Sequence, residues 1–256
     1  MNPTGNVKSR FQFLARTTVK GLTLTKRQRR ICLTVAGTVA LPIVGTTCAP
    51  PTLEPDPRLL EAIAWYTGLA GRVDDARAHA LLGEAAANRG ALSLMWLARV
   101  HSRGRMGFEE DRALARSLAE SVIDEVARAA DAGQLEAVFL MGTANDEGLG
   151  REEDPVLATE WHRRAAEGGH ALGQHNLGNA YAQGRGVEAD DSLAVFWWRK
   201  AAERGDAITQ LRLGEAYEAG RGVPRNDSLA VMWFTRAAES GNQTAATALA
   251  RLNGVR

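Results

Sequence analysis

Cysteine is scarce in this chain. The 256 residues contain only two cysteines, Cys32 and Cys48, and both lie in the first fifth of the sequence. The remaining residues therefore contain neither a disulfide framework nor a thiolate metal site.

Acidic residues are absent from the first 30 positions, which hold eight of the 31 lysines and arginines. Residues 31–256 contain all 30 acidic residues and 23 basic ones. The net charge is therefore about +8 for residues 1–30 and about −7 for the remainder of the chain. Because nucleic-acid-binding surfaces are basic, we expect no nucleic-acid partner for the remainder.

Charge is absent altogether from the 18 residues between Ile31 and Cys48. As a helix, a run of this length spans about 27 Å, near the lower limit for a bilayer core. We therefore predict a basic N-terminal tail (1–30) followed by a transmembrane or signal segment (31–48). Because basic residues precede this segment and acidic ones follow it, the tail should lie on the cytoplasmic side of the membrane and the rest of the chain on the other side. We expect a protein of the bacterial cell envelope, membrane-anchored, with its C-terminal part on the periplasmic or outer side.

How the segment is retained stays open. Cys48 follows the apolar run as the lipidation cysteine of a bacterial lipoprotein signal does, but Gly45, Thr46 and Thr47 depart from that signal. An uncleaved anchor is our first interpretation, with a cleaved signal and a mitochondrial presequence as alternatives. The prolines in 49–57 then predict a stiff, extended spacer.

Catalytic and metal-binding signatures are also missing. His162 and His175 lie on different predicted helices, and no HExxH pairing joins either of them to His170. His170 is predicted to lie in a turn, with its side chain in solvent. His175 is expected to pack in the core. No nucleophile elbow or calcium-loop spacing occurs. We therefore expect no enzyme activity, no metal and no cofactor.

What the sequence does contain is a pattern repeated with a period of 36 residues. The stretches 171–206 and 207–242 agree over their whole length, for example at Gly184 and Gly220. A fixed period of this length indicates a stack of helical repeats.

Each copy contains two helical stretches joined by a glycine-rich corner. Gly184 is placed for a left-handed helix end, and Asp191 for a cap at the start of the second helix. Gly178 falls inside the first helix, where glycine costs roughly 1 kcal/mol relative to alanine. Close helix contact is the expected compensation, with Trp197 and Trp233 filling the gaps between adjacent repeats. Alanine at either tryptophan should then cost about 3–5 kcal/mol.

The motif LGxxYxxGxGV, an acidic residue and then AxxWxxKAAxxG resembles the Sel1-like repeat, a relative of the tetratricopeptide repeat. The resemblance implies an all-α, right-handed α-solenoid of antiparallel helix pairs, here with an N-terminal apolar anchor segment. The solenoid should fill residues 58–256, beginning with a divergent helix pair and ending with one closing helix. Its repeats are expected at about 91–134, 135–170, 171–206 and 207–242.

Sel1-like proteins are mostly adaptors. The resemblance therefore implies a non-catalytic scaffold of the cell envelope that binds a protein partner, or a polysaccharide, through its repeat surface. Two alternatives are kept: a lipoprotein-type subunit of an exopolysaccharide secretion system, and a hydrolase of cell-wall-type ligands. Hydrolysis is linked to cysteine-rich members of the family, and the repeats of this chain contain no cysteine.

A candidate partner-binding face follows from the helix period. Leu177 and Tyr181 should face the core, which places positions i, i+3 and i+7 on the opposite side of that first helix. Equivalent positions in four repeats form three stripes, and Trp96 suits an interface anchor. A merely solvated face would show the same sequence variation. The candidate face consists of Trp96, Arg99, Arg103, Leu140, Thr143, Asn176, Asn179, Gln183, Arg212 and Glu215, with Glu147 and Ala219 completing the stripes.

Overall fold

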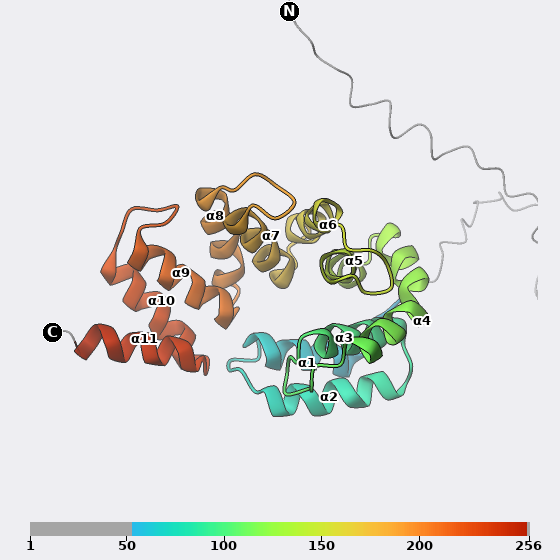
Figure 1. Ribbon diagram of the computed structural model, residues 1–256. Helices are drawn as coiled ribbons and strands as arrows, with labels where there is room; N and C mark the ends of the chain where they lie inside the picture. The colour runs from blue at the N-terminus through green and yellow to red at the C-terminus, as the bar shows by residue number, and fades with distance from the viewer. Residues whose placement is uncertain (1–52, 255–256) are drawn as a thin grey trace, which may run out of the picture. The chain divides into compact units, whose positions relative to one another are not determined.

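Every regular element of the described residues is an α-helix. The computed structural model describes residues 53–254, and the basic tail, the apolar segment and Cys48 lie outside them. The helices follow one another as stacked pairs (Figure 1), which confirms the all-α repeat architecture; the hand of the array stays a prediction. They are α1 (Pro57–Thr67), α2 (Asp75–Ala87), α3 (Ala91–Ser102), α4 (Arg112–Asp131), α5 (Leu135–Glu147), α6 (Pro155–Glu167), α7 (Ala171–Gln183), α8 (Asp191–Glu203), α9 (Ala207–Ala219), α10 (Asp227–Glu239) and α11 (Gln243–Gly254). None of these helices has both the length and the apolar character needed to cross a membrane.

The repeats begin and end their helices with the same local chemistry. The second helices α6, α8 and α10 are capped by Asp154, Asp190 and Asn226, whose side chains accept hydrogen bonds from backbone N–H groups of the first turn. The cap of α8 thus precedes the predicted Asp191, because Asp191 is already helical. At the end of α7, Gly184 has a φ of 65°, the left-handed conformation that its place in the corner predicts.

The second glycine of the corner is required by the neighbouring repeat. Gly186 has a φ of 71°. A Cβ atom there would lie well inside 3.0 Å of the Pro155 carbonyl oxygen, at the start of α6. The Thr159 hydroxyl of the same helix donates to the carbonyl oxygen of Arg185 over 2.9 Å. The corner of one repeat therefore rests on the second helix of the preceding repeat, and this contact sets their spacing.

Within a repeat, an aromatic ring of the second helix packs on a glycine of the first. The ring of Trp198 lies so close to Gly178 that a methyl group on the glycine would overlap it, and Phe234 does the same in the next repeat. Trp233 is buried as predicted, at 6% exposure. Trp197 is less buried than predicted: it is only half-buried, and its neighbour Trp198 is the residue of α8 whose ring packs on α7.

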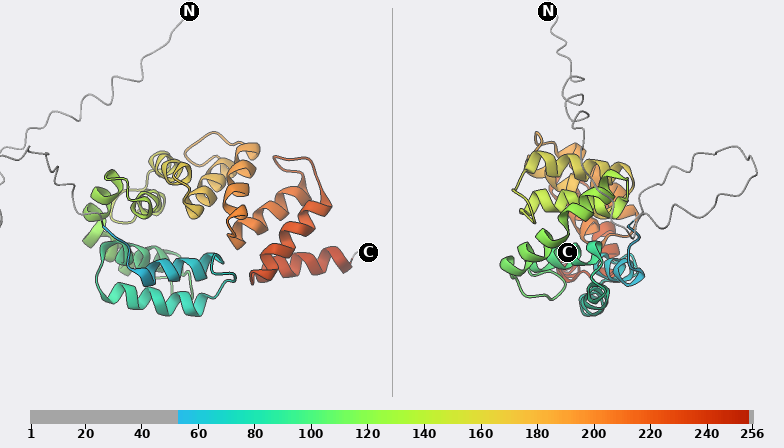
Figure 2. Two further views of the ribbon diagram at one scale, coloured as in Figure 1. Left: turned by 180° about the vertical axis from the view of Figure 1, so that it is seen from behind. Right: turned by 90° about the vertical axis from the view of Figure 1, so that its right-hand side faces the viewer.

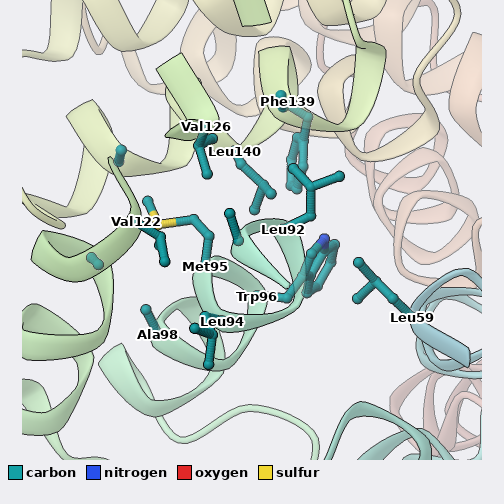
Figure 3. Packing of buried hydrophobic residues seen from close by; sticks show 14 of the residues in the cluster. Leu59, Leu92, Leu94, Met95, Trp96, Ala98, Val122, Val126, Phe139 and Leu140 are labelled. Carbon is teal, nitrogen blue, oxygen red and sulfur yellow. The ribbon is translucent and has the colours of Figure 1, made fainter. Parts of the chain in front are cut away.

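One buried cluster extends from Leu59 of α1 to Leu172 of α7 and includes Trp96. Figure 3 shows Trp96 close to Leu59 of α1, with Phe139 of α5 nearby. Helix α4 has 20 residues where α6 has 13. The longer helix presents Val122 and Val126 to this cluster, so its apolar stripe is buried.

The N-terminal helix pair also touches the C-terminal repeats. The N–H of Val73, between α1 and α2, donates to the carbonyl oxygen of Ser240 over 2.7 Å, and Gly68 packs against Ala207. Figure 2 shows the loop between α1 and α2 beside the beginning of α11. These contacts join segments that are far apart in the sequence.

Candidate binding site

A polar cavity of about 230 Å³ lies among the first helices α3, α5 and α7. Tyr66 of α1 and His162 of α6 also line it. It adjoins a wider groove of about 980 Å³ along the corners, and the two share Arg103, Glu147 and Arg185. An elongated ligand can therefore run along the groove and place one group in the cavity.

The structure brings together about half of the predicted stripe residues. Arg99, Arg103, Glu147, Asn176, Asn179 and Gln183 all line the cavity. Arg212 and Glu215 do not; they pair with each other at 3.0 Å along α9. Whether a partner docks on these residues stays a prediction.

The exposure expected for three other stripe residues is wrong. Trp96 and Leu140 are both fully buried, and Thr143 is 2% exposed. The reason is that a first helix has neighbours on more than one side: α5 is buried at every position from Glu136 to Asn145. Trp96 therefore belongs to the core and cannot serve as a surface anchor.

Ion pairs organise one wall of the cavity. The Glu147 carboxylate lies 2.6 Å from Arg105 and 3.5 Å from Arg103, and it also accepts a hydrogen bond from Ser102. Burial alone would raise the pKa of Glu147, but the hydrogen bond and charge of Arg105 outweigh it and lower the pKa. Glu147 is therefore ionised at neutral pH.

A second carboxylate, Asp146, is tied to the corner of the next repeat. The Nε atom of Arg185 lies 2.9 Å from Asp146, and the Nη2 atom of Arg185 lies 2.5 Å from Glu153. Burial raises the pKa of Asp146 although the charge of Arg185 opposes this. Arg185 thus bridges two repeats at the edge of the cavity.

Arg99 differs from these arginines because it is buried without an ion pair. It is 5% exposed, and its Nε and Nη1 atoms have no hydrogen-bond partner. Its guanidinium lies over the rings of Trp96 and Phe139, 4.6 and 5.5 Å from their centroids. Burial lowers the pKa of Arg99, but an arginine remains protonated at any physiological pH.

His175 is held in one neutral tautomer by a chain of hydrogen bonds. Its Nδ1 lies 2.8 Å from the hydroxyl of Thr209, which in turn donates to Asp206 over 2.5 Å. Its Nε2 accepts from the Asn179 amide over 2.9 Å, and Asn179 accepts from Trp198 over 3.1 Å. Burial lowers the pKa of His175. Both ring nitrogens are thus engaged, and neither is available as a base.

His162 takes the place that Trp198 has in the next repeat. Its ring lies against Gly142 and is 3% exposed, and its Nε2 accepts from Asn176 over 3.2 Å. Burial, reinforced by the charge of Arg99, lowers the pKa of His162 to about 3. The imidazole is therefore neutral at physiological pH and has a packing role.

His170 is not the solvated turn residue that the sequence suggested. Its Nδ1 accepts the N–H of Gly173, which caps α7, and its Nε2 donates to Glu136 over 3.0 Å. The second oxygen of Glu136 accepts from the Trp96 indole over 2.6 Å. His170 therefore joins a helix cap to the buried core.

The sequence analysis did not single out several residues of the cavity, among them Tyr66, Arg105 and Arg185. The two arginines follow directly on the first corner glycine, in GRMG and GRG, so the corner motif itself carries a signal for them. Nothing in the sequence indicates that Tyr66, in the divergent first pair, reaches the repeats. Within residues 53–254, no cluster of three or more His, Cys, Asp or Glu side chains is suited to hold a metal ion.

The fold and the cavity define a helical repeat protein in which successive helix pairs line one polar cavity. The Sel1 repeat model matches residues 135–170, 171–206 and 207–242. Three Sel1 repeats thus fill this part of the chain, and the chain is a Sel1 repeat protein. The longer pair at 91–134 lies outside the matched ranges.

The solved structures that are similar to this chain include two with a TM-score of 0.50. A Sel1 repeat protein from Oxalobacter formigenes is 34% identical with a TM-score of 0.50, over 70% of this chain and 50% of that one. A protective antigen present in uropathogenic Escherichia coli strains, which displays an SLR fold, is 27% identical with a TM-score of 0.50, over 75% of this chain and 47% of that one. This chain therefore spans about half the length of either protein. No curated protein matches it.

Proposed function

We propose that this protein is a non-catalytic adaptor that binds a protein partner through the cavity and the adjoining groove. The observation that carries the proposal is the convergence of polar side chains from α3, α5 and α7 on one cavity. Sel1 repeats generally mediate protein–protein interactions. The groove beside the cavity suits an extended segment of a partner chain.

The histidines of the cavity support binding rather than catalysis. A general base must present a free ring nitrogen within hydrogen-bond reach of its substrate. Both nitrogens of His175 are engaged. The Nε2 of His162 accepts from Asn176, and its Nδ1, which has no hydrogen-bond partner, is shielded from solvent against Gly142. Neither of these two imidazoles is therefore placed to take a proton from a ligand.

Site-specific photo-crosslinking of the full chain tests the proposal. A photoreactive residue at Gln183, an exposed position that lines the cavity, should crosslink one defined partner in cells of the native host. The same residue at Glu160, an exposed position of α6 that does not line the cavity, is the control. An excess of the unmodified chain should abolish the product. Equal crosslinking from both positions, or none from Gln183, would contradict this function.

We also propose that residues 31–48 hold the chain in a bacterial membrane, with the repeats on the periplasmic or outer side. The support comes from sequence, since a basic block precedes the charge-free run. A reporter enzyme fused after Arg256 should be active only if it functions outside the cytoplasm. Activity of a cytoplasm-only reporter would reject this orientation. Incorporation of labelled lipid that depends on Cys48 would show that the anchor is a lipid.

A further inference from the structure

Arg99 is a buried cation for which the chain supplies no counterion in direct contact. Among the residues that the structure describes, no carboxylate oxygen lies within 4.0 Å of its guanidinium. Its Nε and Nη1 atoms are shielded from solvent and have no acceptor. By contrast, Arg103, Arg105 and Arg185 each have a carboxylate partner.

Burying an arginine without a counterion lowers the stability of the folded chain. Removing a guanidinium from water costs several kcal/mol, and arginine cannot escape the cost by losing its proton. The rings of Trp96 and Phe139 offset part of the cost by cation–π contact, and the charge of Glu147 and the phenol of Tyr66 help to stabilise the cation. None of these supplies the paired acceptors that a guanidinium fork takes.

The cavity beside Arg99 has room and charge for one anionic group. Its volume of about 230 Å³ far exceeds the roughly 10–15 Å³ that one water molecule requires. Four arginines line it against two carboxylates, Asp146 and Glu147. With Glu153, which pairs with Arg185 from outside the lining, one positive charge remains in excess. His162 adds no charge at neutral pH because burial holds its pKa at about 3.

We propose that Arg99 recognises a carboxylate of the partner protein, which enters the cavity and pairs with the edge of the guanidinium that borders it. This inference rests on the proposed function and specifies its chemistry. A carboxylate matches the planar fork with two oxygens and brings the single charge that Arg99 lacks. The carboxylate can belong to an aspartate or glutamate side chain or to the C-terminus of a chain.

Short peptides test the chemistry directly on the full chain. Four probes are titrated by calorimetry: an acetylated oligoalanine with a free C-terminus, the same peptide amidated, the amidated peptide with one internal glutamate, and inorganic phosphate. Binding of the free-acid peptide alone assigns the site to a chain terminus, and binding of the glutamate peptide assigns it to a side chain. Binding of phosphate alone, or of no probe, overturns the proposal.

Variants of Arg99 show whether this residue is responsible. Arg99→Lys keeps the charge without the fork, and Arg99→Met removes both; each should weaken carboxylate binding at least about tenfold. Arg128→Gln, which removes an exposed arginine of α4 outside the cavity, should leave binding unchanged. Urea unfolding identifies any variant that fails to fold. Because Arg99 has no ion pair to lose, Arg99→Met should fold at least as stably as the parent chain.

The crosslinking experiment separates this inference from the proposed function. If Gln183 still captures the partner from the Arg99→Lys chain with undiminished yield, the adaptor function stands and carboxylate recognition by Arg99 is refuted. If the peptides bind through Arg99 but Gln183 captures no partner, the carboxylate site stands and the adaptor function fails.

Discussion

Gly184 and Gly186 lie in the same corner and have the same left-handed backbone conformation. Only at Gly186 would an added side chain collide with the backbone of the preceding repeat. Their φ angles are 65° and 71°. At Gly184 the nearest atom to an added Cβ is the Cβ of Ala189, at 3.3 Å. At Gly186 the added Cβ would collide with the carbonyl group of Pro155 and would lie 2.9 Å from the Thr159 hydroxyl oxygen.

The expected costs follow from this difference. Alanine in the left-handed region costs about 1–2 kcal/mol, of which the lower entropy of the unfolded chain offsets about 0.4–1 kcal/mol. Gly184→Ala should therefore cost about 1 kcal/mol. Gly186→Ala adds about 1–3 kcal/mol for forcing two repeats apart and about 1 kcal/mol for weakening the bond from Thr159 to Arg185. Its total should reach about 3–5 kcal/mol.

Urea unfolding of the full chain, followed by far-ultraviolet circular dichroism, measures both values. The next corner provides a second matched pair, because a Cβ at Gly222 would collide with the Asp191 carbonyl group whereas one at Gly220 would have its nearest neighbour at 3.3 Å. Equal destabilisation within each pair, to about 0.5 kcal/mol, would refute the claim that the corner rests on the preceding repeat.

Three further predictions use the same titration. Trp198→Ala should cost about 3–5 kcal/mol because its ring is buried, whereas Trp197→Ala should cost less than about 2 kcal/mol; the reverse order would show that Trp197 is the core residue. Folded His162, with a pKa of about 3, stays neutral while unfolded histidine takes a proton below its usual value of 6.5, so stability should fall as pH drops from 6.5 to 3. His162→Phe should remove up to about 1.4 kcal/mol per pH unit of that slope, and an unchanged slope would contradict a neutral buried imidazole. Glu147→Gln should cost about 2–4 kcal/mol at neutral pH, because Arg105 loses its partner. Since the pKa of Glu147 is lowered, this difference should shrink as pH falls below the usual 4.5, and a constant difference would count against the ion pair.

Candidate site residues were predicted only in part, and the reason lies in how first helices are covered. Helical periodicity shows which residues share a face but not how many faces are buried. Asn176 and Gln183 line the cavity because the far side of α7 is open there, and their role in binding stays a prediction. The same rule failed for Leu140, since α5 is enclosed on all sides by its neighbours.

The local features of the fold followed from the sequence by itself. The period of 36 residues, the helix pairs and the left-handed end at Gly184 each depend on residues close together in the chain. Contacts between distant segments were decided only by the tertiary structure. The bond from Val73 to Ser240 joins the divergent first pair to the last repeat, and Tyr66, Arg99 and Arg185 meet at one cavity from three different parts of the chain. A repeat motif fixes how each unit packs on the next, whereas contacts between non-adjacent units depend on the curvature that accumulates along the stack, and this curvature is a property of the whole array.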